Sequence, residues 1–141
     1  MRTFSKRSLK ALEGVHPLLV SVVTAALHSS PVDFMVLEGV RTLERQKQLY
    51  AQGRTAPGDI VTWTMNSQHF KDSKTGYGMA VDLLPEPYDW KDPAQFDKMA
   101  IAVLHEAMAQ GVRIRWGGDW DEDGNFREAK ETDSPHFELH I

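Results

Sequence analysis

The chain has 141 residues, of which 41% are hydrophobic and 26% charged, a composition typical of a soluble globular protein with a buried core. Its formal net charge of −4 provides no general electrostatic attraction to nucleic acid or anionic lipid. Cysteine is absent, which excludes disulfides and thiolate metal sites. A transition metal would therefore need His, Asp or Glu ligands. No signal peptide or transmembrane span is recognisable after the basic first residues, so we expect synthesis and folding in the cytoplasm.

Hydrophobic periodicity predicts two helices and a strand in the first half of the chain. Apolar residues recur at helical spacing from Leu19 to Leu27, and Pro17 suits a first turn, which predicts a helix over residues 17–29. The segment DFMVLEG, residues 33–39, predicts a strand. A second helix is predicted to follow a Thr42 cap and to end at Gly53.

The second half begins with a long irregular segment, residues 54–78, of the kind that is more often functional than idle. MAVDLLP, residues 79–85, predicts a buried strand stopped by Pro85. A long helix is predicted from Asp92 and Pro93 to about Gly111. Its expected core residues are Phe96, Met99, Ala100, Val103, Leu104 and Met108. VRIRWG and HFELHI, residues 112–117 and 136–141, predict the last two strands.

These elements indicate one domain over residues 1–141, because the sequence contains no internal repeat, low-complexity tract or linker. Strands and helices mix without regular βαβ alternation. The predicted fold class is therefore α+β, a small mixed domain with an antiparallel sheet flanked by helices.

Potential metal ligands gather in the loop and strand segments. Asp82 lies within the apolar run MAVDLL, and a buried carboxylate is usually paired, hydrogen-bonded or metal-bound. His69, His136 and His140 lie in or beside the same half of the chain. Two histidines and one carboxylate form a common ligand set of catalytic zinc. Ligand chemistry alone leaves a zinc site and ordinary structural histidines equally open.

Sequence blocks extend this interpretation. In order, they are GVRTLERQKQLYAQGRT, SQHF with GMAVDLLP, RWGGDW and DSPHFEL, and they span about residues 35–140. They resemble the zinc peptidases related to D-alanyl-D-alanine carboxypeptidases, particularly the phage endolysins that cut the L-alanyl–D-glutamate bond of peptidoglycan. This resemblance implies a fold shared with DD-peptidases and hedgehog signalling domains.

The resemblance also implies roles for individual residues. His69, Asp82 and His136 would be the zinc ligands, and Asp133 the acid–base catalyst. Arg41 would be a cation that binds substrate or stabilises the transition state.

Each role has an alternative. Twelve residues separate His69 from Asp82, more than is usual in the family, with KDSKTGY supplying the excess. A surface loop tolerates such an insertion at little entropic cost, so we retain His69. Asp133 is expected to reach the site through a turn at Ser134 and Pro135, or else only to cap that turn. Arg41 could instead form a surface ion pair.

Two further residues share the predicted strand face of His136. Glu138 and His140 follow it at intervals of two, the period of a strand. We interpret them as supporting partners of the site or as solvated residues, rather than as additional ligands.

An acidic loop provides a second candidate metal site. Asp119, Asp121 and Asp123 precede Gly124 in the pattern that opens a calcium loop. The closing glutamate is displaced, because Lys130 occupies its position and Glu131 follows. Calcium binding and simple solvation both remain open. If calcium binds, it would order the loop that leads to Asp133.

The expected function is that of a zinc-dependent phage endolysin acting on the peptide stem of peptidoglycan. The alternatives are a D-alanyl-D-alanine carboxypeptidase and a non-catalytic, zinc-stabilised binding module. We expect a monomer with no nucleic-acid partner and no stable membrane association. It would accumulate in the host bacterial cytoplasm and reach the wall after membrane permeabilisation.

Overall fold

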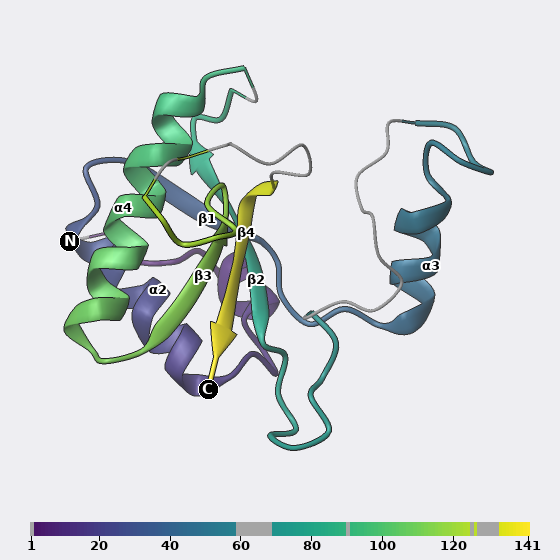
Figure 1. The fold of residues 1–141 in the computed structure, drawn as a ribbon, viewed down its shortest axis with the longest axis horizontal. Helices are drawn as coiled ribbons and strands as arrows, with labels where there is room; N and C mark the ends of the chain where they lie inside the picture. Colours follow the sequence, from purple (N-terminus) through teal and green to yellow (C-terminus); the bar gives the residue numbers. More distant parts are fainter. Residues whose placement is uncertain (1, 59–68, 90, 125, 127–132) are drawn as a thin grey trace.

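A computed structural model describes residues 2–58, 69–89, 91–124, 126 and 133–141. The helices and strands of these segments are α1 (Lys6–Ala11), α2 (Pro17–Ser29), β1 (Asp33–Glu38), α3 (Leu43–Ala51), β2 (Ala80–Glu86), α4 (Pro93–Ala109), β3 (Arg113–Gly117) and β4 (Asp133–His140). Figure 1 shows the sheet at the centre, with α2 and α4 on one side and α3 standing apart on the other.

The four strands form one antiparallel sheet in the order β1-β2-β4-β3. The predicted α+β fold class is thereby confirmed. Because β2 and β4 are neighbours, Asp82 lies directly opposite His136 in their register. The sheet thus joins two residues that are far apart in the sequence.

Helices α2 and α4 pack together and cover one face of the sheet. Alternate residues of the central strands, among them Val81, Leu83, Phe137 and Leu139, are buried in the hydrophobic core. Side chains alternate between the faces of a strand, so Asp82 and His136 project from the opposite face. The core therefore supports the site from behind.

Both long helices begin as the sequence predicted. Pro17 and Pro93 occupy first-turn positions, where a missing N–H costs no hydrogen bond. The predicted cap of α3 is confirmed, because the Thr42 side chain accepts a hydrogen bond from the Arg45 N–H.

Several predicted details differ from the structure. Pro85 does not stop its strand, because β2 continues to Glu86. Among the described strands, only β1 pairs with β2 at Pro85, so the missing N–H of proline is tolerated there. Met108 is 81% exposed, since the buried stripe of α4 continues through Ala107 instead. Ile141 lies beyond β4 and is 75% exposed.

Helix α1 was not predicted from the sequence. Because this helix is only six residues long, its amphipathic periodicity is hard to detect. The Ser5 side chain caps it, and the Ser8 hydroxyl accepts a hydrogen bond from the Val36 N–H of β1. This helix therefore protects part of the sheet edge.

The irregular segment before β2 is described over residues 54–58 and from residue 69 onward, while residues 59–68 lie outside the described part of the chain. Lys71 and Gly78 form an antiparallel bridge, and a turn from Asp72 to Gly76 closes the excursion between them. The additional residues between His69 and Asp82 thus form a local hairpin-like loop whose ends meet. Among the described helices, none has both the length and the apolarity needed to cross a membrane.

Candidate metal centre and catalytic site

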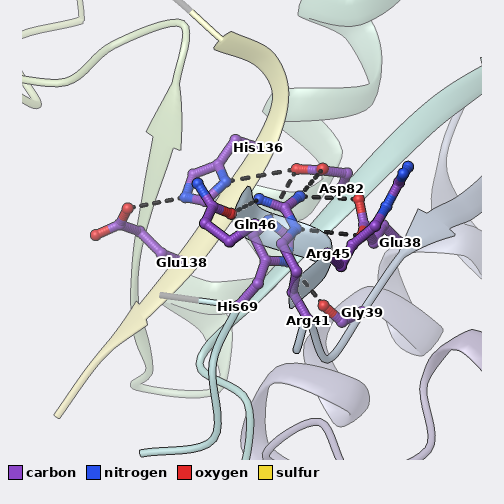
Figure 2. Close-up of polar contacts among 9 residues, drawn as sticks. All are labelled: Glu38, Gly39, Arg41, Arg45, Gln46, His69, Asp82, His136 and Glu138. Carbon is purple, nitrogen blue, oxygen red and sulfur yellow. Dashed lines mark hydrogen bonds and ion pairs between the residues drawn. The ribbon is translucent and has the colours of Figure 1, made fainter. Parts of the chain in front are cut away.

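Three segments bring together His69, Asp82 and His136 (Figure 2). One oxygen of Asp82, Oδ1, lies 3.3 Å from Nε2 of His69 and 3.4 Å from Nδ1 of His136. The three potential ligand atoms all lie within 4.8 Å of one another. The fold therefore brings together the three residues that the family resemblance implied as ligands.

Hydrogen bonds at the far side of each ring determine its orientation. Nδ1 of His69 lies 2.7 Å from the carbonyl oxygen of Gly39, which can only accept, so Nδ1 carries the proton. Nε2 of His136 lies 2.8 Å from Oε1 of Glu138, which likewise accepts when ionised. In the neutral rings, both nitrogens that face Asp82 are therefore acceptors.

The backbone before α3 holds His69 in this position. The Arg41 N–H donates a hydrogen bond of 2.8 Å to the His69 carbonyl, and Gly39 accepts from its ring. Gly39 must remain a glycine, because a Cβ atom there would lie 1.9 Å from the carbonyl oxygen of Ala11. Close backbone packing thus links α1, the end of β1 and His69.

Three acceptors facing one another repel unless a cation lies between them. Within the described residues, Oδ1 of Asp82 is buried and accepts no hydrogen bond of normal geometry. A buried oxygen of this kind is costly to leave without a partner. The donor set of two imidazole nitrogens and one carboxylate fits a divalent transition metal such as zinc, and a proton can occupy the same position in its absence.

Electrostatics at this centre follow from the same contacts. Burial alone would raise the pKa of Asp82, but the neighbouring His69 and His136 hold that pKa well below its usual range. Burial opposes the charged form of His136, but hydrogen bonds to Asp82 and Glu138 raise its pKa to about 10. Metal binding must therefore displace a firmly held proton.

Arg41 is buried beside the three potential ligands rather than paired at the surface. Its guanidinium donates to both carboxylate oxygens of Glu38, at 3.1 and 2.8 Å, and to Oε1 of Gln46 at 2.8 Å. It also lies 3.4 Å from Oδ2 of Asp82. Because Arg41 contacts Oδ2, the other oxygen of Asp82, Oδ1, is directed at the two histidines.

Asp133 is the first residue of β4, and Ser134 and Pro135 continue that strand instead of forming the predicted turn. The register shifts at this point: Trp116 pairs with Phe137, whereas Gly117 pairs with Asp133. The irregularity, rather than a turn at Ser134 and Pro135, accommodates the extra residues of β4.

The environment of Asp133 raises the pKa of its carboxyl group above the ordinary value. Burial, followed by the negative charge of Asp82, raises the pKa of Asp133 to about 6. The positive charges of His136, His69 and Arg41 act in the opposite direction. A carboxyl group with this pKa is deprotonated at neutral pH and can still return a proton readily.

Glu138 and His140 lie beside the candidate metal-binding group but are not part of it. Oε2 of Glu138 lies 2.7 Å from Nε2 of His140 and accepts a hydrogen bond of 3.1 Å from Arg115. Burial opposes ionisation of Glu138, but the hydrogen bond to His136 leads the interactions that lower its pKa to about 2. This arrangement agrees with the supporting role predicted from the strand period.

Sequence analysis did not identify three residues that contact this centre: Glu38, Gly39 and Trp120. Glu38 precedes Arg41 by three residues, a spacing that could have indicated an ion pair. Trp120 lies with its ring 5.5 Å from that of His136, a contact that only the tertiary structure reveals.

The acidic loop also brings its carboxylates together. One oxygen from each of Asp119, Asp121 and Asp123 lies within 4.8 Å of the others. Asp119 additionally accepts hydrogen bonds from the N–H groups of Asp123 and Gly124. Lys130 and Glu131, which decide whether the loop closes as a calcium site, lie outside the described residues.

Comparisons with known proteins agree with this geometry. The family model described as phage L-alanyl-D-glutamate peptidase matches residues 1–140. An L-alanyl-D-glutamate peptidase of Escherichia phage T5 is 30% identical over 142 aligned positions, covering 96% of each chain. The peptidoglycan L-alanyl-D-glutamate endopeptidase CwlK of Bacillus subtilis is 27% identical, with 89% of this chain and 73% of that protein covered.

A solved structure extends the similarity to the fold. The L-Ala D-Glu endopeptidase ChiX of Serratia marcescens superimposes with a TM-score of 0.74 and is 32% identical in sequence. The comparison covers 99% of this chain and 90% of ChiX. On the nearly complete match to the family model and the close similarity to the phage T5 peptidase, the chain belongs to the phage L-alanyl-D-glutamate peptidase family.

Proposed function

We propose that this protein is a zinc-dependent endopeptidase that cuts the bond between L-alanine and D-glutamate in the peptide stem of peptidoglycan. His69, Asp82 and His136 would hold the zinc ion. One observation carries the metal assignment: two ring nitrogens lie 3.3 and 3.4 Å from a buried carboxylate oxygen, and in the neutral rings all three atoms are acceptors. Membership of a family described by this activity supports the choice of bond.

The residues of the site divide the chemical work. A bound zinc ion makes a water molecule more acidic and polarises the carbonyl group of the scissile peptide. Asp133 accepts a proton from the attacking water and delivers it to the leaving amine nitrogen, so the elements of water add across the broken C–N bond. In the metal-free protein, burial and the charge of Asp82 raise the pKa of Asp133 to about 6, which shows an environment that favours proton uptake.

Arg41 supports this reaction by its position. Because Glu38, Gln46 and Asp82 already engage its guanidinium, we assign it first to orienting Asp82. Its positive charge also favours the negative charge that develops on the carbonyl oxygen during attack. This proposal keeps the predicted transition-state role of Arg41 and adds the orientation of Asp82.

Digestion of purified peptidoglycan tests the proposal. Mass analysis should find new carboxyl termini at L-alanine and new amino termini at D-glutamate, and a chelator should abolish both. Asp133→Ala protein serves as the control for contaminating peptidases. Release of D-alanine alone would identify a carboxypeptidase, whereas bound zinc without new termini would identify a binding module.

We further propose that the protein acts as a monomeric, single-domain phage endolysin spanning residues 1–141. It would accumulate in the host bacterial cytoplasm and attack the wall once the membrane is permeabilised, without stable binding to membrane or nucleic acid. The description of the family as phage peptidases supports this role. Added from outside, the protein should clear Gram-negative cells only after outer-membrane permeabilisation. Clearing of cells with an intact outer membrane would contradict this role. Light scattering of the purified protein would test whether it is a monomer.

The acidic loop supports a secondary proposal of calcium binding at Asp119, Asp121 and Asp123. Their clustered carboxylate oxygens are ligands that calcium prefers. Isothermal titration calorimetry of calcium into the wild type and into Asp121→Asn tests this proposal. Equal heats for the two proteins would indicate an acidic loop that is merely solvated.

A further inference from the structure

Glu138 is a buried carboxylate between two imidazole rings. Its side chain is only 5% exposed. Oε1 lies 2.8 Å from Nε2 of His136, while Oε2 lies 2.7 Å from Nε2 of His140. Arg115 donates a hydrogen bond to the same Oε2. Both oxygens are therefore engaged, and each partner constrains the plane of the carboxylate.

The strand register explains why these groups meet. Glu138 lies opposite Arg115 of β3 and opposite Ala80 of β2, and His136 lies opposite Asp82. Ala80 is fully buried and its side chain carries no polar atom that could bond to Glu138. The sheet thus places Glu138 two residues beyond the ligand, with its partner Arg115 on the neighbouring strand.

The contact with Glu138 determines which nitrogen of His136 faces the metal centre. A carboxylate accepts a hydrogen bond, so Nε2 of His136 keeps its proton and Nδ1 presents its lone pair toward Asp82. His69 is oriented differently, by the neutral carbonyl of Gly39. A charged acceptor strengthens the hydrogen bond and makes the ring a better electron donor to a metal.

We propose that Glu138 is a positioning residue that selects Nδ1 of His136 as the metal-facing atom and thereby sets the affinity of the site for zinc. Arg115 and His140 hold Glu138 in the required orientation. The inference rests on the proposed zinc site and adds a determinant of its affinity that lies outside the ligand set.

Two substitutions separate orientation from charge. Glu138→Gln retains an oxygen that can accept from Nε2 but removes the negative charge, whereas Glu138→Ala removes both. Zinc affinity would be measured by competition with a chromophoric chelator, and thermal unfolding of the metal-free proteins would report folding. Glu122→Gln is the matched control, since Glu122 forms a 2.8 Å ion pair with Arg113 of β3 and makes none of the contacts to His69, Asp82 or His136 described above.

The expected order of zinc affinity is wild type, then Glu138→Gln, then Glu138→Ala. Glu138→Ala should bind zinc roughly 10- to 100-fold more weakly, the usual effect of losing such a partner. Glu122→Gln should match the wild type. A loss of zinc affinity in Glu138→Gln is an effect that a mere packing role would not produce, because glutamine fills nearly the same volume as glutamate. This loss remains measurable if the alanine variant fails to fold.

The controls also separate this inference from the proposed function. Wild-type protein that binds no zinc would overturn both. Wild-type protein that binds zinc, together with unchanged affinity in Glu138→Gln and Glu138→Ala, would overturn only the role of Glu138. A loss of affinity in Glu122→Gln equal to that in Glu138→Ala would also overturn it, because the effect would not be specific to the His136 contact.

Discussion

At the scale of single residues, the site contains two carboxylates with opposite properties. The neighbouring histidines hold the pKa of Asp82 below its usual range despite burial, so it remains charged. Burial and the charge of Asp82 instead raise the pKa of Asp133 to about 6. A ligand needs permanent charge and an acid–base catalyst needs exchangeable charge, so the two environments suit the two proposed roles.

Substitution of Asp133 should affect turnover and leave the metal centre in place. Asp133→Ala is expected to reduce kcat by roughly 10²-fold or more, the scale of a general acid–base group, with zinc content unchanged. His136→Ala, as the contrasting variant, should lose both zinc and activity. Peptidoglycan digestion and metal analysis measure the two effects. Loss of zinc from Asp133→Ala would mean that this carboxylate is itself a ligand.

The pH dependence of stability should reveal the proton shared by His136 and Asp82 in the metal-free protein. The pKa of His136 is raised from 6.5 to about 10 on folding. Its stabilising contribution is therefore complete below pH 6.5 and is lost as pH rises through about 10. The thermal unfolding midpoint of metal-free protein should fall over that interval.

His136→Gln is the control for the pH measurement, because it retains the other groups that titrate at high pH. Its unfolding midpoint should fall less than that of the wild type between pH 6.5 and 10. Parallel curves for the two proteins would contradict the assignment of the proton to His136.

At the scale of secondary-structure elements, the irregular junction of β3 and β4 positions Asp133. Gly117 lies opposite Asp133, and a Cβ atom there would approach the Asp133 carbonyl oxygen to 2.1 Å. The indole N–H of Trp116 donates a hydrogen bond of 2.7 Å to the carbonyl of Ser134. Backbone packing and the hydrogen bond from the Trp116 indole thus hold the first residues of β4 against β3.

Gly117→Ala should displace Asp133 and lower activity. A shift of about 1 Å in a catalytic group can cost roughly 10²-fold in rate, so we expect a large loss of kcat. Arg113→Ala is the control, because it removes only an exposed ion pair near the other end of β3. Kinetic assays and thermal unfolding would be compared, and full activity in Gly117→Ala would refute the positioning role of this junction.

At the scale of the whole molecule, the proposed metal would connect three distant parts of the chain. His69 follows the segment after α3, Asp82 belongs to β2, and His136 belongs to the last strand. A metal bound only by the folded arrangement stabilises it by mass action, by about 2.7 kcal/mol when free metal exceeds its dissociation constant 100-fold.

Removal of zinc by a chelator should therefore lower both activity and stability. At that metal excess we expect the unfolding midpoint to fall by roughly 5–10 °C, and added zinc should restore it. Thermal unfolding with and without chelator tests this, with Asp82→Asn as a variant that should respond weakly. A full-activity preparation free of zinc, cobalt and manganese would exclude the zinc-peptidase assignment.

Local properties of the sequence were sufficient to predict most elements and the types of ligand. Helix α2, strand β3 and the start of α4 follow from periodicity and capping residues, which act within a few positions of the chain. Asp82 was conspicuous because an acid within an apolar strand requires a partner. The absence of cysteine limited the transition-metal ligands to histidine and carboxylate.

Only the tertiary structure determined how those residues are used. The neighbouring positions of β2 and β4 place Asp82 opposite His136, while the carbonyl of Gly39 and the carboxylate of Glu138 orient the two rings. These contacts depend on strand register and on backbone packing between distant segments, which local periodicity does not encode. The sequence by itself therefore determined which side chains could form the site, and the sheet decided which atoms of those side chains face one another.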